Sequence, residues 1–386
     1  MSAGTTGLLV ESRLAGPDDV CDLVREHARA LGATDATIYL VDREQVSLSS
    51  VGGAERLLVN ATLPGAAFTA GVRRWSARDD GTARLWMPLC DGVERLGLLA
   101  LDFAAELDQD TEIAWLPPLI AFMSATAALV QSKSLSGDLF ERSRRSKSMT
   151  IAAELQSVLL PPRTFGTEQV TVSGTMEPAY DIGGDTFDYA LNDGVLHVAL
   201  LDAMGHGLEA ASLAALGMAA YRHARRDGEH LTEIGRYLDE VVSEAYDGER
   251  FITGWLGHLD IADGTLAYFN AGHPGALLLR GGKVVKQLDA PPVLPFGFRD
   301  PPMLASEDLE PGDRVLVYTD GVVEARSSTH GFFGEERLIA FFEREAASGH
   351  EAPEILRRLT LSVLDHQEGE LQDDSSMLLL EWAGPR

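Results

Sequence analysis

The sequence predicts an α+β protein with two domains joined by a helical linker. The chain has 386 residues, of which 45% are hydrophobic and 24% are charged. This suits two ordinary domains and excludes disordered or collagen-like chains. Charge is uneven, with net values of −8 over residues 1–130, +3 over 131–150 and −22 over 151–386. Helical and strand-like apolar patterns occur on both sides of the basic stretch, so we expect domains at 16–130 and 161–383 and a linker at 131–160.

The acidic composition limits the partners. A net charge of −27 repels nucleic acid and anionic membrane surfaces, so we expect neither as a partner. Cys21 and Cys90 show no CxxC spacing, and the first residues lack a basic stretch followed by an apolar core. We therefore expect a cytoplasmic protein.

One apolar stretch, Ala114 to Val130, carries no charge over 17 residues. It is shorter than the roughly 20 residues that span a bilayer. Its small residues and the early Pro117-Pro118 pair favour a buried or dimer-forming helix.

The N-terminal domain is expected to hold a helix-flanked sheet. Helical spacing covers Pro17 to Leu31 and returns at Thr111–Val130. Strand patterns lie between these helices, at 36–41, 46–50, 84–89 and 96–103. The stretch RLWMPLCDGVERLGLLALDF, residues 84–103, resembles the penultimate hairpin of GAF sensory domains. The resemblance implies a sensor that binds a small molecule or pairs with itself, while any α/β domain with one hairpin is the alternative.

The segment from Leu129 to Leu160 has the pattern of one continuous helix that ends at Pro161-Pro162. A basic cluster between Arg142 and Lys147 interrupts its apolar positions. We expect a signalling helix that forms a short parallel dimer; a solvated linker helix is the alternative.

Acidic residues in the C-terminal segment gather where apolar strands begin or end. Four clusters stand out: Asp181-Ile-Gly-Gly-Asp185-Thr-Phe-Asp188, Asp202-Ala-Met-Gly-His206-Gly207, Asp320-Gly321 and Asp373-Asp374. One Asp-Gly pair is first of all a turn, but four such clusters predict a shared site. Converging carboxylates suit hard cations such as Mg²⁺ or Mn²⁺. If no metal were bound, the negative charges would repel one another and some of the carboxylates would bind protons.

The ordered motifs resemble a known family. DIGGDTFD (181–188), DAMGHG (202–207), FITGWLGHLDIADGTLAYFNAGHP (251–274), TDGVVEA (319–325) and DDSS (373–376) follow the order of motifs in the SpoIIE/RsbU-type branch of PP2C metal-dependent serine/threonine phosphatases. The resemblance extends from about Glu154 to Trp382 and is highly specific, because five ordered motifs do not arise from turn chemistry alone.

The resemblance implies an α/β/β/α sandwich with a site for two Mn²⁺ or Mg²⁺ ions at one end. By this resemblance Asp202 bridges both metals, the Ala203 carbonyl completes one, and Asp320 and Asp373 bind the other. Asp185 supports the site through water. Asp374 either lies behind the metal ligands or binds a third metal ion. Asp181 and Asp188 are equally compatible with plain turn residues.

The expected chemistry is hydrolysis without a phosphoenzyme. Two divalent ions lower the pKa of a bridging water and hold the phosphate oxygens. No cysteine nucleophile is needed, and both cysteines lie outside the phosphatase segment. His206 is a candidate leaving-group acid, with a helix-capping or hydrogen-bonding role as the alternative. Asn270 and His273 are expected to fix a turn. No arginine lies just before Asp181, where eukaryotic relatives hold the phosphate with one, so substrate grip must come from the metals or elsewhere.

The sequence thus predicts a sensor-regulated protein serine/threonine phosphatase, expected to be a homodimer. The family resemblance implies a phosphorylated anti-sigma factor antagonist of the STAS type as substrate. The second hypothesis is a pseudo-phosphatase scaffold that binds partners without turnover. The presence of every expected metal-binding carboxylate weighs against it. A small-molecule phosphohydrolase is disfavoured because no nucleotide-binding loop occurs.

Overall fold

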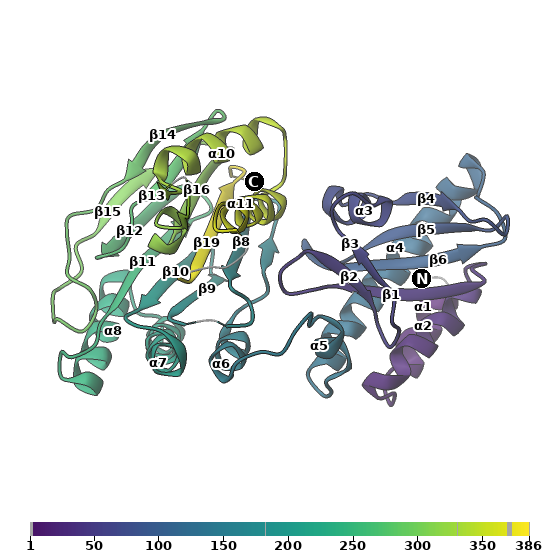
Figure 1. The fold of residues 1–386 in the computed structure, drawn as a ribbon, viewed down its shortest axis with the longest axis horizontal. Coiled ribbons are helices and arrows are strands. Elements are labelled where there is room, and N and C mark those ends of the chain that lie inside the picture. The colour runs from purple at the N-terminus through teal and green to yellow at the C-terminus, as the bar shows by residue number, and fades with distance from the viewer. Residues whose placement is uncertain (1–2, 182, 330, 369–372, 386) are drawn as a thin grey trace. The chain divides into compact units, whose positions relative to one another are not determined.

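The computed structural model describes residues 3–181, 183–329, 331–368 and 373–385. The chain forms two compact units, Met1–Lys147 and Ser148–Arg386. Figure 1 shows the helices and strands of both units.

The N-terminal unit is built on an antiparallel six-stranded sheet in the order β3-β2-β1-β6-β5-β4. Its central hairpin pairs β5 with β6 around Gly92, where the predicted hairpin lies. The strands are β1 Asp35–Val41, β2 Ser47–Ser50, β3 Arg56–Leu58, β4 Arg74–Ala77, β5 Ala83–Asp91 and β6 Glu94–Phe103. The helices are α1 Ala3–Glu11, α2 Val20–Arg29, α3 Leu63–Ala70, α4 Gln109–Ser134 and α5 Leu139–Ser143. The short elements β3, α3 and β4 carry no strong apolar period and were not predicted.

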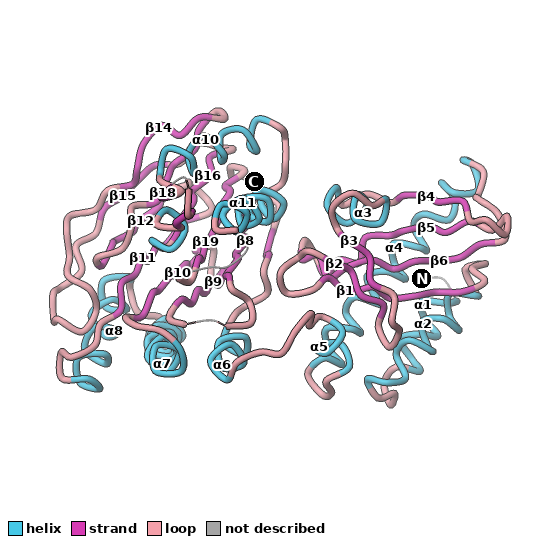
Figure 2. The backbone as a smooth tube through the Cα atoms, in the orientation of Figure 1, coloured by secondary structure: helices cyan, strands magenta, loops and turns pink. Residues whose placement is uncertain are grey.

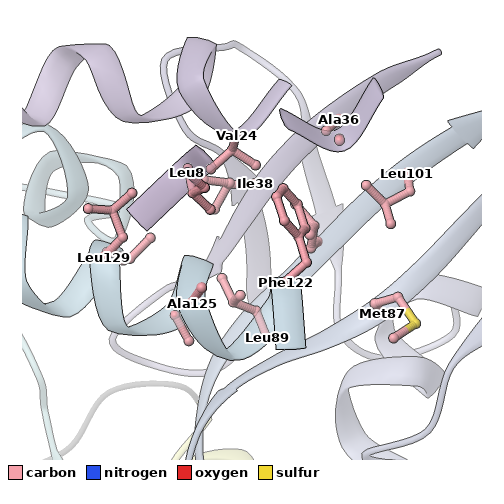
Figure 3. Close-up of a cluster of buried hydrophobic side chains, with 14 of the residues drawn as sticks. Leu8, Val24, Ala36, Ile38, Met87, Leu89, Leu101, Phe122, Ala125 and Leu129 are labelled. Carbon is pink, nitrogen blue, oxygen red and sulfur yellow. The ribbon is translucent and has the colours of Figure 1, made fainter. Parts of the chain in front are cut away.

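The main core of this unit lies between the sheet and helices α1, α2 and α4. Leu8, Val24 and Phe122 meet Ile38 and Leu101 there, and all five are at most 2% exposed (Figure 3). A smaller cluster on the other face packs Phe68 of α3 against Tyr39 and Trp86.

Helix α4 contains the predicted apolar stretch. The described residues include one helix, Asp110–Ser134, that is long and apolar enough to cross a membrane by length and composition, a test that core helices also pass. Leu119 and Phe122 of this helix are buried in the core. Pro117 and Pro118 lie inside α4 and not in its first turn, because Asp108 caps the helix earlier by accepting a hydrogen bond from the Thr111 N–H.

The continuous helix expected over 129–160 is wrong. The structure has three helices, since α4 ends at Ser134, α5 is short, and α6 spans Ile151–Leu159 (Figure 2). Gly137 packs so closely on Pro17 that a Cβ atom would lie 2.7 Å from the proline ring. Arg43 binds Glu141 at 2.7 Å and so ties α5 to the N-terminal unit. Thr150 caps α6 through the Ala153 N–H, so the segment 131–160 is divided between the two units.

The C-terminal unit has two sheets with helices outside. One sheet has the order β15-β12-β11-β10-β9 and the other β14-β13-β16-β19-β8-β7. The core between them contains Phe187, Trp255 and Leu378. Helices α7 Gly207–Arg226 and α8 Leu231–Tyr246 pack outside the first sheet, and α10 Glu335–Ala347 and α11 Ala352–His366 outside the second. This is the expected α/β/β/α arrangement, with α7 and α8 lying apart from α10 and α11 in Figure 1.

The strands of this unit are β7 Thr164–Gly166, β8 Val170–Glu177, β9 Asp185–Asn192, β10 Val195–Ala203, β11 Ile252–Asp260, β12 Thr265–Ala271, β13 Ala276–Arg280, β14 Lys283–Leu288, β15 Ala305–Asp308, β16 Asp313–Tyr318 and β19 Ser375–Trp382. A short ribbon pairs β17 Arg326–Ser327 with β18 Gly331–Phe332, and α9 covers Asp320–Val323.

Candidate metal centre

Strand ends bring the predicted carboxylates together. Asp185 begins β9 and pairs in register with Asp202 near the end of β10. Asp320 begins α9 directly after β16, and Asp373 and Asp374 precede β19, which pairs with β16. The two sheets therefore deliver acids from four chain segments to one end of the sandwich.

The electrostatics show that these acids are close neighbours. Burial and, after it, repulsion by Asp320, Asp373 and Asp374 together raise the pKa of Asp202 to about 7. Burial also raises the pKa of Asp185, which is 1% exposed, and the charges of Asp202 and Asp374 add to this effect. The pKa of Asp320 is raised by desolvation and then by Asp373. Among the residues that the structure describes, none of the five carboxylates forms an ion pair with Lys or Arg.

The five acids differ in what their oxygens contact. Asp374 Oδ2 accepts hydrogen bonds from the backbone N–H groups of Gly183 at 2.7 Å and Gly184 at 2.6 Å. Asp374 thus orders the loop before Asp185, and its Oδ2 atom faces backbone donors. The Thr319 hydroxyl donates to Asp185 Oδ2 at 2.9 Å and accepts from the Ser376 N–H at 2.9 Å.

Glycines permit the close approach of these segments. A Cβ atom on Gly184 would lie 2.1 Å from the Ala203 carbonyl oxygen, and one on Gly321 would lie 1.8 Å from the Asp374 carbonyl oxygen. Any side chain at these positions would force apart the strand ends that carry the acids. The glycines of the motifs are therefore required by packing.

Thr253 and His273 extend the site, and these contacts with Asp202 were not predicted from the sequence. Thr253 lies opposite Asp202 in the register, and its hydroxyl is 3.5 Å from Asp202 Oδ2 and 3.2 Å from His273 Nδ1. Burial lowers the pKa of His273 to about 3, so this imidazole is neutral. The carbonyl of His273 accepts a hydrogen bond from Asn270 at 2.6 Å, which confirms the predicted turn.

The remaining predicted residues lie outside this cluster. Asp188 is 2% exposed and binds Arg222 and Arg225, each at 2.7 Å, so it joins β9 to α7. Asp181 is exposed. His206 occupies the N-cap position of α7 and is exposed, but its side chain makes no capping hydrogen bond. The capping alternative for His206 is therefore wrong in this structure.

The donor chemistry fits a hard divalent cation. Carboxylate and carbonyl oxygens are the ligands that Mg²⁺ and Mn²⁺ prefer, and the mutual repulsion of Asp202, Asp320 and Asp185 lacks a neutralising side chain. Within the described ranges, no group of three or more Asp, Glu, His or Cys side chains is arranged to hold an ion.

Comparisons with known proteins place this fold in a class. The unit has the fold of a PP2C-like domain, since the SiaA-PP2C domain of Pseudomonas aeruginosa superposes with a TM-score of 0.51 at 21% identity, covering 60% of this chain and 94% of that one. More particularly, residues 192–383 match the family model described as Stage II sporulation protein E (SpoIIE). The C-terminal half is thus a SpoIIE-family PP2C-like domain, and the first motif, at 181–188, precedes the matched range.

Curated relatives resemble the chain over part of their length. Protein IcfG of Synechocystis is 27% identical over an alignment of 255 residues. The match covers 58% of this chain and 40% of IcfG. Phosphoserine phosphatase RsbU of Bacillus subtilis is 25% identical over 232 residues, 60% of this chain and 68% of RsbU. Phosphoserine phosphatases are therefore among its homologues, and the chain spans less than half of IcfG.

Proposed function

We propose that this chain is a metal-dependent protein serine/threonine phosphatase. The observation that carries the proposal is a set of neighbouring acids at the strand ends of a SpoIIE-family, PP2C-like domain, with no basic partner among the residues that the structure describes. The relationship to the phosphoserine phosphatase RsbU supports the same chemistry.

Two Mn²⁺ or Mg²⁺ ions would be held by Asp202, the Ala203 carbonyl, Asp320 and Asp373, with Asp185 behind them. When bound, such ions lower the pKa of a water nucleophile and neutralise the charge of the phosphate group. Thr253 orients Asp202 through its hydroxyl, and Thr319 does the same for Asp185. Asp374 holds the Gly183-Gly184 backbone in place.

The proposed substrate is a phosphorylated anti-sigma factor antagonist of the STAS type, in a partner-switching pathway. The resemblance of five motifs to the RsbU-type branch supports this choice. The alternative is a pseudo-phosphatase scaffold, and the presence of all the expected carboxylates speaks against it. The exposed His206 stays our candidate for the leaving-group acid, since it adjoins the loop after Asp202.

We further propose that the N-terminal unit is a GAF-like sensor in a cytoplasmic homodimer, with a small molecule as its possible ligand. The β5–β6 hairpin within the sheet supports the resemblance to GAF domains. The exposed Ile113 and Ile120 of α4 support a dimer contact. With α4, α5 and α6 separate, a change in the sensor would reach the phosphatase through segments 135–138 and 144–150.

The test is phosphate release from a panel of serine-phosphorylated STAS-domain proteins, with Mn²⁺ and with EDTA. We expect phosphate release in the presence of Mn²⁺ and none in EDTA. A variant that lacks residues 1–130 should keep the turnover but lose any regulation. Binding of the phosphorylated proteins without any release would favour the scaffold.

A further inference from the structure

Arg250 lies beside the loop that follows Asp202 and Ala203. The ladder between β10 and β11 continues past its end, because the Met204 N–H donates to the Phe251 carbonyl at 3.1 Å. One residue further, a Cβ atom on Gly205 would lie 3.5 Å from Arg250 Nη1. A guanidinium group therefore borders the candidate metal centre, although no arginine lies directly before Asp181 in the sequence.

A hollow of about 550 Å³ opens next to this arginine. Leu208, Leu213 and Tyr246 give it apolar walls, and Glu209 and Arg250 are at its polar edge. Arg250 Nη2 binds Glu209 Oε2 at 2.7 Å, with side chains that are 35% and 79% exposed. An exposed pair of this kind stabilises a protein only weakly, so another carboxylate can readily replace Glu209.

Apolar side chains are exposed around the same edge. Met204, Leu208 and Phe298 are 41%, 50% and 44% exposed. The Phe298 ring lies 5.7 Å from that of Phe251, and its segment is fixed because Asp239 accepts hydrogen bonds from the N–H groups of Gly297 and Arg299. The hydrogen bonds of its own segment therefore hold Phe298 at this edge.

We propose that Met204, Leu208, Arg250 and Phe298 form a docking surface for the polypeptide that flanks the phosphoserine of a protein substrate. An apolar side chain of the substrate enters the hollow, and Arg250 exchanges Glu209 for a carboxylate of the substrate. Exposed apolar groups around an arginine are the composition of protein interfaces, and they lie next to the acids that would act on the phosphate. The inference rests on the proposed phosphatase function, because the surface is defined by its position beside that site.

The surface is tested by comparing a protein substrate with a small one. A serine-phosphorylated STAS-domain protein and p-nitrophenyl phosphate are assayed with the full chain in Mn²⁺. Arg250→Ala and Leu208→Ser should each lower kcat/KM for the phosphoprotein by about tenfold, through KM, and leave turnover of p-nitrophenyl phosphate within about twofold. Arg236→Ala is the matched control, since Arg236 also binds exposed glutamates, and Val285→Ser controls for loss of an exposed apolar group.

Binding measured in EDTA separates this proposal from the phosphatase function. The affinity for the phosphorylated protein should fall about tenfold in both variants even if no turnover is seen in any assay. Equal affinities in wild type, Arg250→Ala and Leu208→Ser would overturn the docking surface. A similar loss of activity toward both substrates would also overturn it, since Arg250 would then act on the phosphate itself.

Discussion

Two aspartates three residues apart on β9 have opposite surroundings. Asp185 and Asp188 are 1% and 2% exposed. Asp188 binds two arginines of α7, whereas the carboxylates nearest to Asp185 are those of Asp202 and Asp374. A buried charge is stable only when it is neutralised. The fold neutralises Asp188 with its own side chains, whereas no basic side chain among the described residues pairs with Asp185, and this difference is the basis for proposing Asp185 as part of a cation site.

The largest expected effect is the loss of activity in Asp202→Asn or Asp320→Asn. Each change removes a charged ligand and keeps the shape of the side chain, so phosphate release in Mn²⁺ should fall by more than about a hundredfold while the circular dichroism spectrum is unchanged. Near wild-type turnover of either variant in metal-replete buffer would show that the acids at the strand ends are not needed for catalysis.

The second prediction sets Asp188 against Asp185. Asp188→Asn leaves Arg222 and Arg225 without their carboxylate, and should lower the free energy of unfolding by about 3–5 kcal/mol. Asp185→Asn removes an unneutralised charge and should leave the metal-free protein as stable as wild type or more so. Urea unfolding of both variants in EDTA measures this, and equal destabilisation of the two would remove the distinction between them.

The third prediction concerns pH. Asp202 has a pKa of about 7 in the folded protein, above its unfolded value, so protonation stabilises the metal-free fold below pH 7 and this stability is lost as pH rises through 7. A cation competes with these protons. The increase in Tm caused by Mn²⁺ should therefore be larger at pH 8 than at pH 5.5, and a shift that is independent of pH would argue against binding at Asp202.

The smallest effect is expected from the cysteines. Cys21 and Cys90 lie in the N-terminal unit, and burial raises the pKa of the Cys21 thiol. The double variant Cys21→Ser, Cys90→Ser should keep wild-type phosphatase activity. Isolation of a stable phosphoenzyme after acid quench would contradict the proposed direct hydrolysis.

The sequence predicted those parts of the molecule that depend on local pattern. The apolar strands that deliver Asp202 and Asp320 were found because each is a largely apolar run that leads to an aspartate, and the ordered motifs implied the sandwich. The roles of Thr253 and Thr319 were missed, because their partners come from strands that are distant in sequence. The break between α4 and α6 was missed for a similar reason, since the contacts Gly137–Pro17 and Arg43–Glu141 outweigh the helical pattern.

Calorimetric titration of Mn²⁺ into the full chain tests directly whether the neighbouring acids form a metal centre. We expect wild type to bind two ions and Asp202→Asn to lose this binding. Asp181→Asn, which changes the exposed aspartate of the 181–188 motif, should retain it. No binding by wild type, or unchanged binding by Asp202→Asn, would contradict the assignment of the neighbouring acids as a metal centre.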